Sequence, residues 1–380
     1  MNFNLWGGIL VKIGDLVNIQ TGKLDANASS KNGMYPFFTC SKEPLRIDSY
    51  SYDCECVLLA GNGDLNVKYY NGKFDAYQRT YILESKSEKL TNKYLYYFMK
   101  KYVGVLRNES IGGVIKYIKL ENIINAEIPL YNIEKQNEIV NKIDIVENII
   151  KLKKHQLDNL DNLIKSQFLE MFGDPILNPM DWKVKKLKDI SNKIMSGNTP
   201  KGGDKVYVNS GIEFYRSQNV WKNKLIKDDI AYIDEKTHNS MKKSSLKHND
   251  LLITKTGRIN TENSSLGRTA LYNGEDDRAN INGHVYMVRL NNNENHEYIL
   301  RILISDQYRD YIRTVCVGGI DKRQLNKEHI ENFPIIYPPK DLQKQYTEII
   351  KKIEKKKMRL QDSLEEMQRL QESLIEKYFE

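Results

Sequence analysis

Two stretches of the chain, residues 133–172 and 341–379, repeat one spacing of apolar side chains. In each stretch these side chains alternate four and three positions apart for about five heptads, which is the seam of a coiled coil. The copies share one frame, so that Ile143 has its counterpart in Ile350, 207 residues later. A seam that occurs twice, each time after a globular segment, predicts a duplicated chain.

The seam contains polar as well as apolar positions. Lys153 and Gln167 interrupt the first copy, and Lys357 and Gln371 interrupt the second. Such residues either fix the register of paired helices or are solvent-facing gaps in an imperfect seam. The complete set of seam positions is Ile139, Ile143, Val146, Ile150, Lys153, Leu157, Leu160 and Gln167, then Ile350, Ile353, Lys357, Leu360, Leu364, Met367, Gln371 and Leu374.

The long helices divide the chain into five parts. The expected parts are a globular domain at 1–131, a helix at 132–172, a linker at 173–183, a globular domain at 184–338 and a helix at 339–380. Gly173 with the two prolines that follow it predicts the end of the first helix. The fold class is α+β: two pseudo-repeated α/β domains separated by two long helices that form an antiparallel coiled coil.

Local similarities extend the repeat into the globular domains. Thr21-Gly22 corresponds to Ser196-Gly197, and the buried strand expected at 56–60 corresponds to 250–254. The aromatic helix expected at 90–103 corresponds to a helix at 298–312. We therefore expect the two domains to share one plan and to differ in their loops.

No sequence motif for catalysis or metal binding is present. The chain has no nucleotide-binding P-loop and no metalloprotease or methyltransferase signature. Its four cysteines form no C-x-x-C pair, and Cys54 and Cys56 are expected on opposite faces of a strand, so no metal site is expected. No apolar stretch approaches 18 residues, so no membrane helix is expected. Residues 1–10 lack a basic start and a long apolar run, so no signal peptide is expected, and a cytoplasmic protein is expected.

The loops that follow the expected strands carry side chains suited to nucleic acid. Arg pairs with guanine, Asn and Gln pair with adenine, and Lys, Ser and Thr contact phosphate. The net charge of +8 is compatible with a polyanionic partner, and the lysine runs at 151–154 and 351–357 are further candidates. The candidate DNA-binding residues are Gly61, Asn62, Gln78, Arg79, Lys116, Ser196, Thr199, Arg216, Ser217, Gln218, Asn219, Lys255, Thr256, Arg258, Arg268, Asn280, Asn282, Lys322 and Arg323.

This order of segments resembles the specificity (S) subunit of type I restriction–modification systems. In the second half the resemblance is carried by 196–200 (SGNTP), 212–216 (IEFYR), 250–254 (DLLIT) and 333–335 leading to 342–345. In the first half it is carried by 35–38 (YPFF) and by 128–130 leading to 133–136. The first half lacks the SGNTP loop and keeps only Thr21-Gly22.

The resemblance implies a subunit that is not itself an enzyme. Each globular part would be a target recognition domain that reads one half of a bipartite double-stranded DNA sequence, and the helices would set the gap between the half-sites. Two modification (methyltransferase) subunits and restriction/translocase subunits would be its partners. Those partners would use S-adenosylmethionine, ATP and Mg, and this chain would bind no cofactor.

Two other interpretations stay open on the sequence alone. The chain could be a DNA methyltransferase or nuclease with an unrecognised active site. It could instead be a coiled-coil scaffold whose domains bind proteins.

Overall fold

A computed structural model describes residues 7–259, 261, 263–319 and 322–380. Its contacts divide the chain into two compact units. The first unit is Met1–Leu157 with Arg359–Glu380, and the second unit is Asp158–Met358. Each unit therefore contains one globular domain together with part of each long helix.

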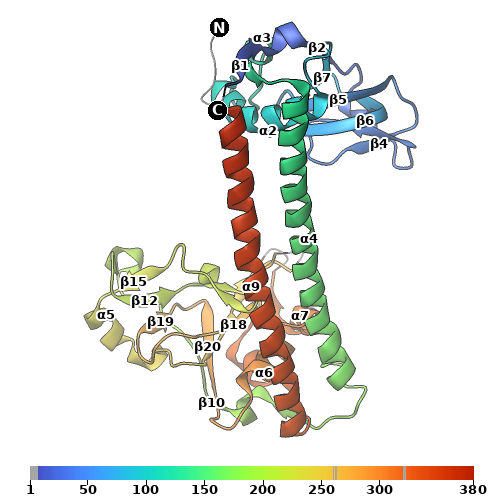
Figure 1. Ribbon diagram of the computed structural model, residues 1–380. Coiled ribbons are helices and arrows are strands. Elements are labelled where there is room, and N and C mark those ends of the chain that lie inside the picture. The colour runs from blue at the N-terminus through green and yellow to red at the C-terminus, as the bar shows by residue number, and fades with distance from the viewer. Residues whose placement is uncertain (1–6, 260, 262, 320–321) are drawn as a thin grey trace. The chain divides into compact units, whose positions relative to one another are not determined.

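The first unit is built on a six-stranded sheet (Figure 1). All neighbouring strands are antiparallel except β3 and β6, which are parallel. The strands, in spatial order, are β2 (Val17–Thr21), β7 (Thr80–Ser85), β5 (Tyr52–Ala60), β6 (Val67–Ala76), β3 (Tyr35–Phe38) and β4 (Leu45–Ile47).

One helix covers this sheet. Helix α2 (Asn92–Glu109) begins at Thr91, whose hydroxyl accepts a hydrogen bond from the backbone N–H of Tyr94. Its buried face packs in one core with Val57 and Leu59 of β5. The remaining elements are the 3₁₀ turn η1 (Ala26–Ala28), β1 (Ile9–Lys12), α1 (Ile13–Leu16), α3 (Leu120–Ile124) and β8 (Glu127–Leu130), with β1 and β8 paired antiparallel.

The second unit contains several smaller sheets. The first is β10 (Ser191–Ser196), β20 (Val285–Leu290), β16 (Leu251–Thr254) and β18 (Thr269–Leu271). The second is β11 (Tyr207–Val208), β15 (Ala231–Ile233), β12 (Ile212–Tyr215) and β19 (Ala279–Ile281). The others are β17 (Thr256–Gly257), β22 (Arg323–Gln324) and β21 (Val317–Gly318), the hairpin β13 (Val220–Trp221) and β14 (Lys224–Leu225), and the pair β9 (Val184–Lys186) and β23 (Pro334–Ile336).

Short helices complete the second unit. They are η2 (Leu187–Ile190), η3 (Gly203–Val206), η4 (Ser217–Asn219), α5 (Glu235–Ser240), η5 (Lys242–Ser244), α6 (His296–Leu303), α7 (Asp306–Val315) and α8 (Lys327–Glu331). The single helix expected at 298–312 is wrong, because α6 ends before Ser305. The Ser305 hydroxyl accepts from the backbone N–H of Tyr308 and so caps a new helix, α7.

The globular domains share the plan that the sequence predicted. The antiparallel order β2-β7-β5 recurs as β10-β20-β16, and the parallel pair β3·β6 recurs as β12·β19. A Cβ on Gly22 would lie 2.1 Å from the carbonyl oxygen of Ala76, and one on Gly197 would lie 2.0 Å from that of Ile281. Both positions need glycine for the same close approach, which confirms that Thr21-Gly22 corresponds to Ser196-Gly197.

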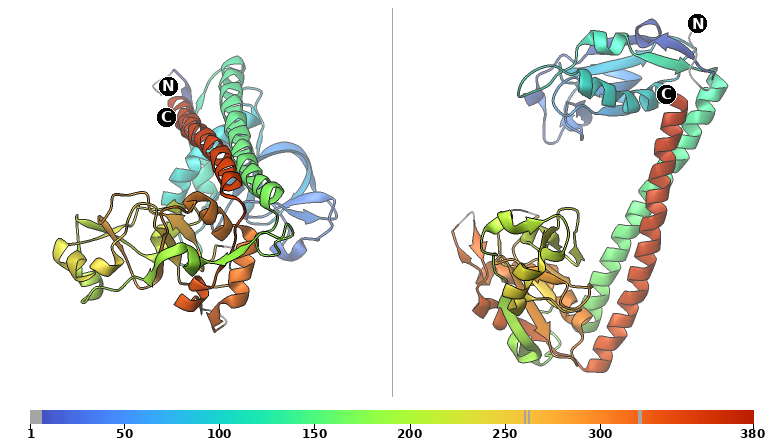
Figure 2. Two further views of the ribbon diagram at one scale, coloured as in Figure 1. Left: turned by 90° about the horizontal axis from the view of Figure 1, so that it is seen from below. Right: turned by 90° about the vertical axis from the view of Figure 1, so that its left-hand side faces the viewer.

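The predicted long helices are α4 (Ile133–Phe172) and α9 (Lys340–Phe379). Within each unit the segments of the two helices lie side by side (Figure 2). In the first unit Val146 and Ile150 of α4 pack with Leu364 of α9, whereas in the second unit Ile164 of α4 packs in one core with Ile350. Later residues of α4 therefore meet earlier residues of α9, and the pair is antiparallel.

Three of the four polar seam positions bond to the other helix. In the first unit the Lys153 ammonium donates to the Ser363 hydroxyl (2.9 Å), and the Gln371 amide donates to the Glu147 carboxylate (2.9 Å). In the second unit Lys357 forms an ion pair with Asp161. Gln167 is half-buried. These bonds favour the register-setting interpretation over that of solvent-facing gaps, because each ties one position of α4 to one of α9.

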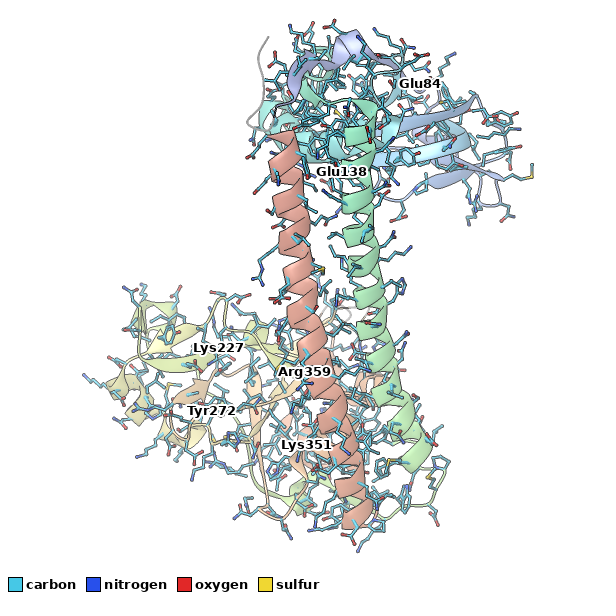
Figure 3. The ribbon with its side chains drawn as sticks, in the orientation of Figure 1. Glu84, Glu138, Lys227, Tyr272, Lys351 and Arg359 are labelled. Atoms are coloured by element: carbon cyan, nitrogen blue, oxygen red, sulfur yellow. The ribbon has the colours of Figure 1, made fainter. Side chains whose placement is uncertain are left out.

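The outer faces of the long helices are charged (Figure 3). Glu138 of α4 lies between Lys135 and Lys142, which lower the pKa of its carboxyl to about 2. Lys351 of α9 pairs with Glu348, and Arg359 is exposed. The charged side chains keep these faces hydrated while the seam is buried. No helix in the described part of the chain is both long and apolar enough to cross a membrane.

Candidate nucleic-acid interface

In the second unit, loops from five strands meet at one end of the sheets. Because β12 and β19 are parallel, both finish there, and the backbone N–H of Asn282 donates to the carbonyl of Tyr215 (3.0 Å). The ends of β10 and β16 flank the start of β20. The backbone N–H of Gly197 donates to the carbonyl of Val285 (3.0 Å), and the backbone N–H of Lys255 donates to the carbonyl of His284 (2.8 Å). The fold thus brings together the predicted residues Ser196, Thr199, Arg216, Lys255 and Asn282.

The loop after β12 is organised by one carboxylate. Asp229 accepts from the Arg216 guanidinium (3.0 Å) and from the Gln218 amide (2.8 Å). These contacts, led by the Gln218 hydrogen bond, lower the pKa of Asp229. Arg216 and Gln218 are thereby held in defined positions, with the neighbouring Ser217 half-buried.

Two of the predicted DNA-binding side chains form hydrogen bonds inside the domain instead. Asn219 is 1% exposed, and its amide donates to the carbonyls of Ile226 and Asp229. Asn280 is fully buried and donates to the carbonyl of Met241. Neither side chain can reach a nucleic acid from these positions, so the prediction that they bind DNA is wrong.

An aromatic side chain that the sequence analysis did not single out lies beside this loop. The Arg268 guanidinium stacks on the Trp221 ring, 3.8 Å from its centroid, and donates to the carbonyl of Ser264 (3.0 Å). The Trp221 indole donates to the carbonyl of Gln218 (3.0 Å). Burial, and then the charge of Arg309, lower the pKa of Arg268. The signal that could have identified it is the presence of Trp221 two residues after the run of polar candidates Arg216–Asn219.

A third group of predicted residues surrounds a hollow of about 580 Å³. Thr256, Arg258 and Lys322 line it, together with Asn263 and Ser264. Pairing of β17 with β22 brings these segments together, because Gly257 lies opposite Arg323. Arg258 and Lys322 are exposed, so their charges face solvent.

The first unit has an equivalent loop cluster. The backbone N–H of Gly61 donates to the backbone carbonyl of Arg79 (2.8 Å), and that of Gly63 donates to the backbone carbonyl of Lys116 (2.9 Å). The backbone N–H of Ile118 donates to the carbonyl of Gly61 (3.0 Å). In the second unit the corresponding hydrogen bond runs from the backbone N–H of Leu325 to the carbonyl of Lys255 (2.9 Å). Gly61, Asn62, Arg79 and Lys116 therefore lie together.

The remaining predicted residue of the first unit, Gln78, directly precedes Arg79 in the turn between β6 and β7. The Gln78 amide donates to the Asp25 carboxylate (3.0 Å), which holds this side chain on the loop that contains Asp25.

Several interface cations have no acidic partner. Within the described ranges, Arg79, Lys116, Arg258 and Lys322 are exposed and none is paired with a carboxylate. An exposed cation without a partner keeps its full charge available to an anionic ligand. This arrangement suits the spaced negative charges of a phosphate backbone.

Nothing in the described chain resembles a metal centre. Among the residues that the structure describes, no three His, Cys, Asp or Glu side chains are grouped closely enough to hold a metal ion. The expectation that Cys54 and Cys56 lie on opposite faces was wrong. Residues two apart on a strand share a face, and both cysteines pack in the cluster around Phe74. Burial raises the pKa of both thiols.

Comparison with known proteins gives a consistent family assignment. Residues 9–162 and 179–367 both match the model of the type I restriction modification DNA specificity domain. The chain is 36% identical over 155 residues to the type I restriction enzyme EcoDI specificity subunit of Escherichia coli. That match covers 41% of this chain and 34% of the relative, so it spans about a third of the EcoDI subunit.

Other relatives match over nearly the full length. The type I restriction enzyme MjaVIII specificity subunit of Methanocaldococcus jannaschii is 22% identical over 97% of this chain and 89% of its own. The fold resembles the S subunit of a type I restriction-modification system from M. genitalium, with a TM-score of 0.60, 17% identity and coverage of 99% and 97%. The fold also resembles a chain in a solved structure that concerns complex assembly and conformational transition of the type I R-M system. The TM-score is 0.58 and the identity is 16%, and the match covers 100% of this chain and 99% of that chain.

Proposed function

The chain belongs to the type I restriction–modification DNA specificity family, and we propose that its two domains read the two halves of one bipartite DNA sequence. One observation carries this proposal. Both units present unpaired, exposed cations at the same end of an equivalent strand arrangement, Arg79 and Lys116 in the first and Arg258 and Lys322 in the second. A duplicated basic loop face suits a ligand that offers phosphates at two places.

We assign some of these residues to base contacts and others to phosphate contacts. Arg216 and Gln218 are preorganised by Asp229, and Arg268 is preorganised by Trp221 and Ser264. Side chains fixed before binding lose little entropy on docking, so these are the residues we assign to base edges in the second half-site. Lys116 and Lys322, which are exposed and unpaired within the described chain, are assigned to phosphates.

We assign the helices α4 and α9 to the spacing between half-sites. Each is a continuous helix of 40 residues that begins in one unit and ends in the other. Such a helix spans about 60 Å, whereas major grooves on one face of DNA recur about every 34 Å. The cross-helix bonds at Lys153, Gln371 and Lys357 would resist sliding of one helix along the other.

Catalysis is assigned to partner subunits. We propose that modification subunits bind this chain and methylate DNA with S-adenosylmethionine, that restriction subunits add ATP- and Mg-dependent translocation and cleavage, and that the complex acts in the cytoplasm. The family match gives no support to the alternative that the chain is itself a methyltransferase or nuclease, or a scaffold that binds only proteins.

Mapping of the methylated sequence tests this function. The chain is combined with its modification subunits, and the bases methylated in a random DNA library are identified. A bipartite sequence is expected, and Arg216→Gln, at a residue assigned to base edges, should change only one of its halves. Methylation by the chain alone, or a change in both halves with Arg216→Gln, would contradict the proposal.

A further inference from the structure

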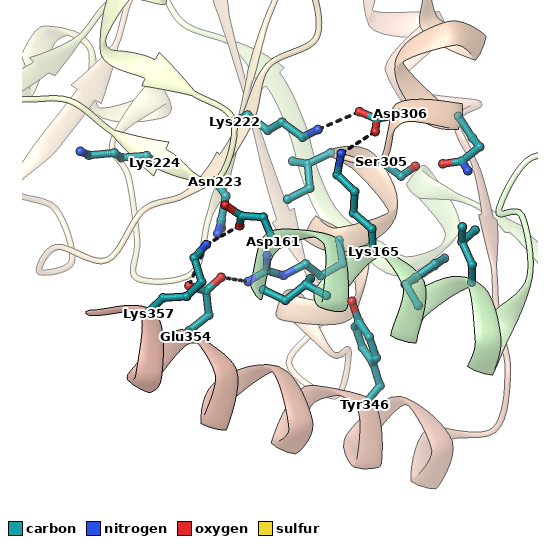
Figure 4. Close-up of a pocket in the computed structure, with 16 residues that line it drawn as sticks. Asp161, Lys165, Lys222, Asn223, Lys224, Ser305, Asp306, Tyr346, Glu354 and Lys357 are labelled. Carbon is teal, nitrogen blue, oxygen red and sulfur yellow. Dashed lines mark hydrogen bonds and ion pairs between the residues drawn. The ribbon is translucent and has the colours of Figure 1, made fainter. Parts of the chain in front are cut away.

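A cavity of about 640 Å³ lies within the second unit (Figure 4). Segments from α4, α9, the corner between α6 and α7 and the turn between β13 and β14 line it. Ile164, Phe168 and Leu169 of α4, with Ile304 after α6, supply its apolar surface. This volume is in the range that buries a small organic ligand.

Ion pairs form two opposite walls of the cavity. On one side the ammonium groups of Lys165 and Lys222 both contact the Asp306 carboxylate, at 2.8 and 3.1 Å. These contacts, led by that of Lys165, lower the pKa of Asp306. On the other side Arg301 contacts Glu354 at 2.9 Å.

The charge of the walls favours an anion. The five cationic side chains are Lys165, Lys222, Lys224, Arg301 and Lys357, and the three acidic ones are Asp161, Asp306 and Glu354. Glu297 also pairs with Arg301 (2.6 Å), so five cations face four carboxylates, and the remaining positive charge would attract a negatively charged group to the cavity.

A buried hydroxyl in the cavity lacks a partner. Tyr346 of α9 is 0% exposed, with its ring 5.5 Å from that of Phe168. Its hydroxyl has no hydrogen-bond partner within the described part of the chain. By contrast, the nearby buried tyrosines Tyr298 and Tyr308 donate to backbone carbonyls at 3.1 and 3.2 Å. An unsatisfied buried polar group destabilises the folded chain, so a bound polar atom at this point would be stabilising.

We propose that this cavity is a binding site for a small amphiphilic anion, with an apolar ring-sized body and one carboxylate, sulfonate or phosphate group. The body lies against Phe168 and Leu169, and the anionic group is held by Lys165 and Lys222. The Tyr346 hydroxyl forms a hydrogen bond with a polar atom of the ligand. Lys222 directly follows Trp221, on which Arg268 stacks, so the ligand would bind beside the candidate nucleic-acid interface without depending on DNA.

Anilinonaphthalene sulfonate, which has this chemistry and fluoresces when bound in an apolar site, serves as the probe. Titration of the folded full chain should show one saturable site in the micromolar range. The double variant Lys165→Gln with Lys222→Gln should weaken binding about tenfold, equivalent to about 1.4 kcal/mol. Leu169→Trp should abolish binding by filling the cavity, and Tyr346→Phe should weaken it several-fold while keeping the ring.

Lys236→Gln, at an exposed position on α5 outside the cavity, is the matched control and should bind as the natural chain does. Unfolding temperatures confirm that each variant is folded. Binding only at millimolar probe, or equal affinity in the double lysine variant, Tyr346→Phe and Leu169→Trp, would overturn the proposal. Stoichiometric displacement of the probe by a modification subunit would also overturn it, because the cavity would then belong to a protein interface.

Discussion

The ring of Phe379, at the end of α9, lies 5.0 Å from the ring of Tyr94 in α2. The corresponding ring at the end of α4, that of Phe172, lies 5.0 Å from Tyr298 in α6. Both tyrosines donate to a backbone carbonyl before the next long helix, Tyr94 to Pro129 (2.7 Å) and Tyr298 to Ile336 (3.1 Å). Each domain core is therefore completed by the helix that follows the other domain.

Removal of the Phe379 ring should destabilise the first unit. The residue is 6% exposed, and truncation of a buried phenylalanine to alanine costs about 3–5 kcal/mol. In Phe379→Ala, hydrogen exchange of the β5 amides should accelerate more than that of the β16 amides, and Phe172→Ala should show the opposite pattern. Equal acceleration in both units would contradict the view that each ring belongs to one core.

Gly22, which lies against the end of β6 at Ala76, should not tolerate a side chain. In Gly22→Ala the new Cβ would meet the Ala76 carbonyl oxygen at 2.1 Å, and relief of that overlap should cost about 2 kcal/mol or more. Gly104→Ala is the matched control, because its Cβ meets nothing within 4 Å and alanine favours the helix by about 0.5–1 kcal/mol. Chemical denaturation measures both, and equal stabilities would contradict the predicted clash.

Asp229 should remain ionised well below neutral pH. Its pKa is lowered from 3.8 in the folded chain, so its stabilising contacts are present above that value and are lost as the pH falls through the lowered pKa. NMR of the side-chain carboxyl should give a midpoint below 3.8, which Arg216→Gln should raise and Asp228→Asn should leave unchanged. A midpoint at or above 3.8 in the natural chain would contradict the assigned contacts.

Replacement of Asp229 should also affect recognition of DNA. In Asp229→Asn, Arg216 loses its ionic partner, and the methylated sequence should become less specific in the second half-site only. Asp228→Asn again serves as control and should leave both half-sites unchanged. Relaxed specificity in the first half-site would show that Asp229 acts on the whole assembly.

Phosphate-contacting and base-contacting residues should differ in their salt dependence. Lys322→Gln should weaken DNA binding for all sequences and reduce the slope of log affinity against log salt by about one. Trp221→Ala frees the Arg268 guanidinium from its stack, and should reduce discrimination between sequences while the slope stays unchanged. Binding isotherms of the assembled complex across a salt series distinguish the two outcomes, and identical effects would contradict the assignments.

The sequence predicted the local features of this fold well. The helices expected at 132–172 and 339–380 are observed as α4 (Ile133–Phe172) and α9 (Lys340–Phe379), so each boundary agrees to within one residue. This accuracy follows from periodicity, which is a property of neighbouring residues. The break between α6 and α7 was also local: Ser305 followed by Asp306 is a helix-start signal, which the analogy with the aromatic helix α2 obscured.

Features that depend on tertiary packing could not be predicted. Asn219 and Asn280 look like base-reading residues in the sequence, but burial assigns them to structural hydrogen bonds. The Arg268–Trp221 stack joins two segments that no spacing rule connects. The cavity at Tyr346 is formed by four segments far apart in the sequence, so only the folded chain reveals it.

A change in the length of the helix pair tests most directly whether α4 and α9 set the distance between the half-sites. One heptad is inserted into each helix at matched positions, after Lys153 in α4 and before Ser363 in α9, and the methylated sequence is mapped with the modification subunits present. Seven residues add about 10 Å of helix, which corresponds to about three base pairs at 3.4 Å each. If α4 and α9 set the distance between the half-sites, both half-sites stay unchanged and the spacer becomes about three base pairs longer. An active complex that keeps the original spacer would show that the helices do not set it.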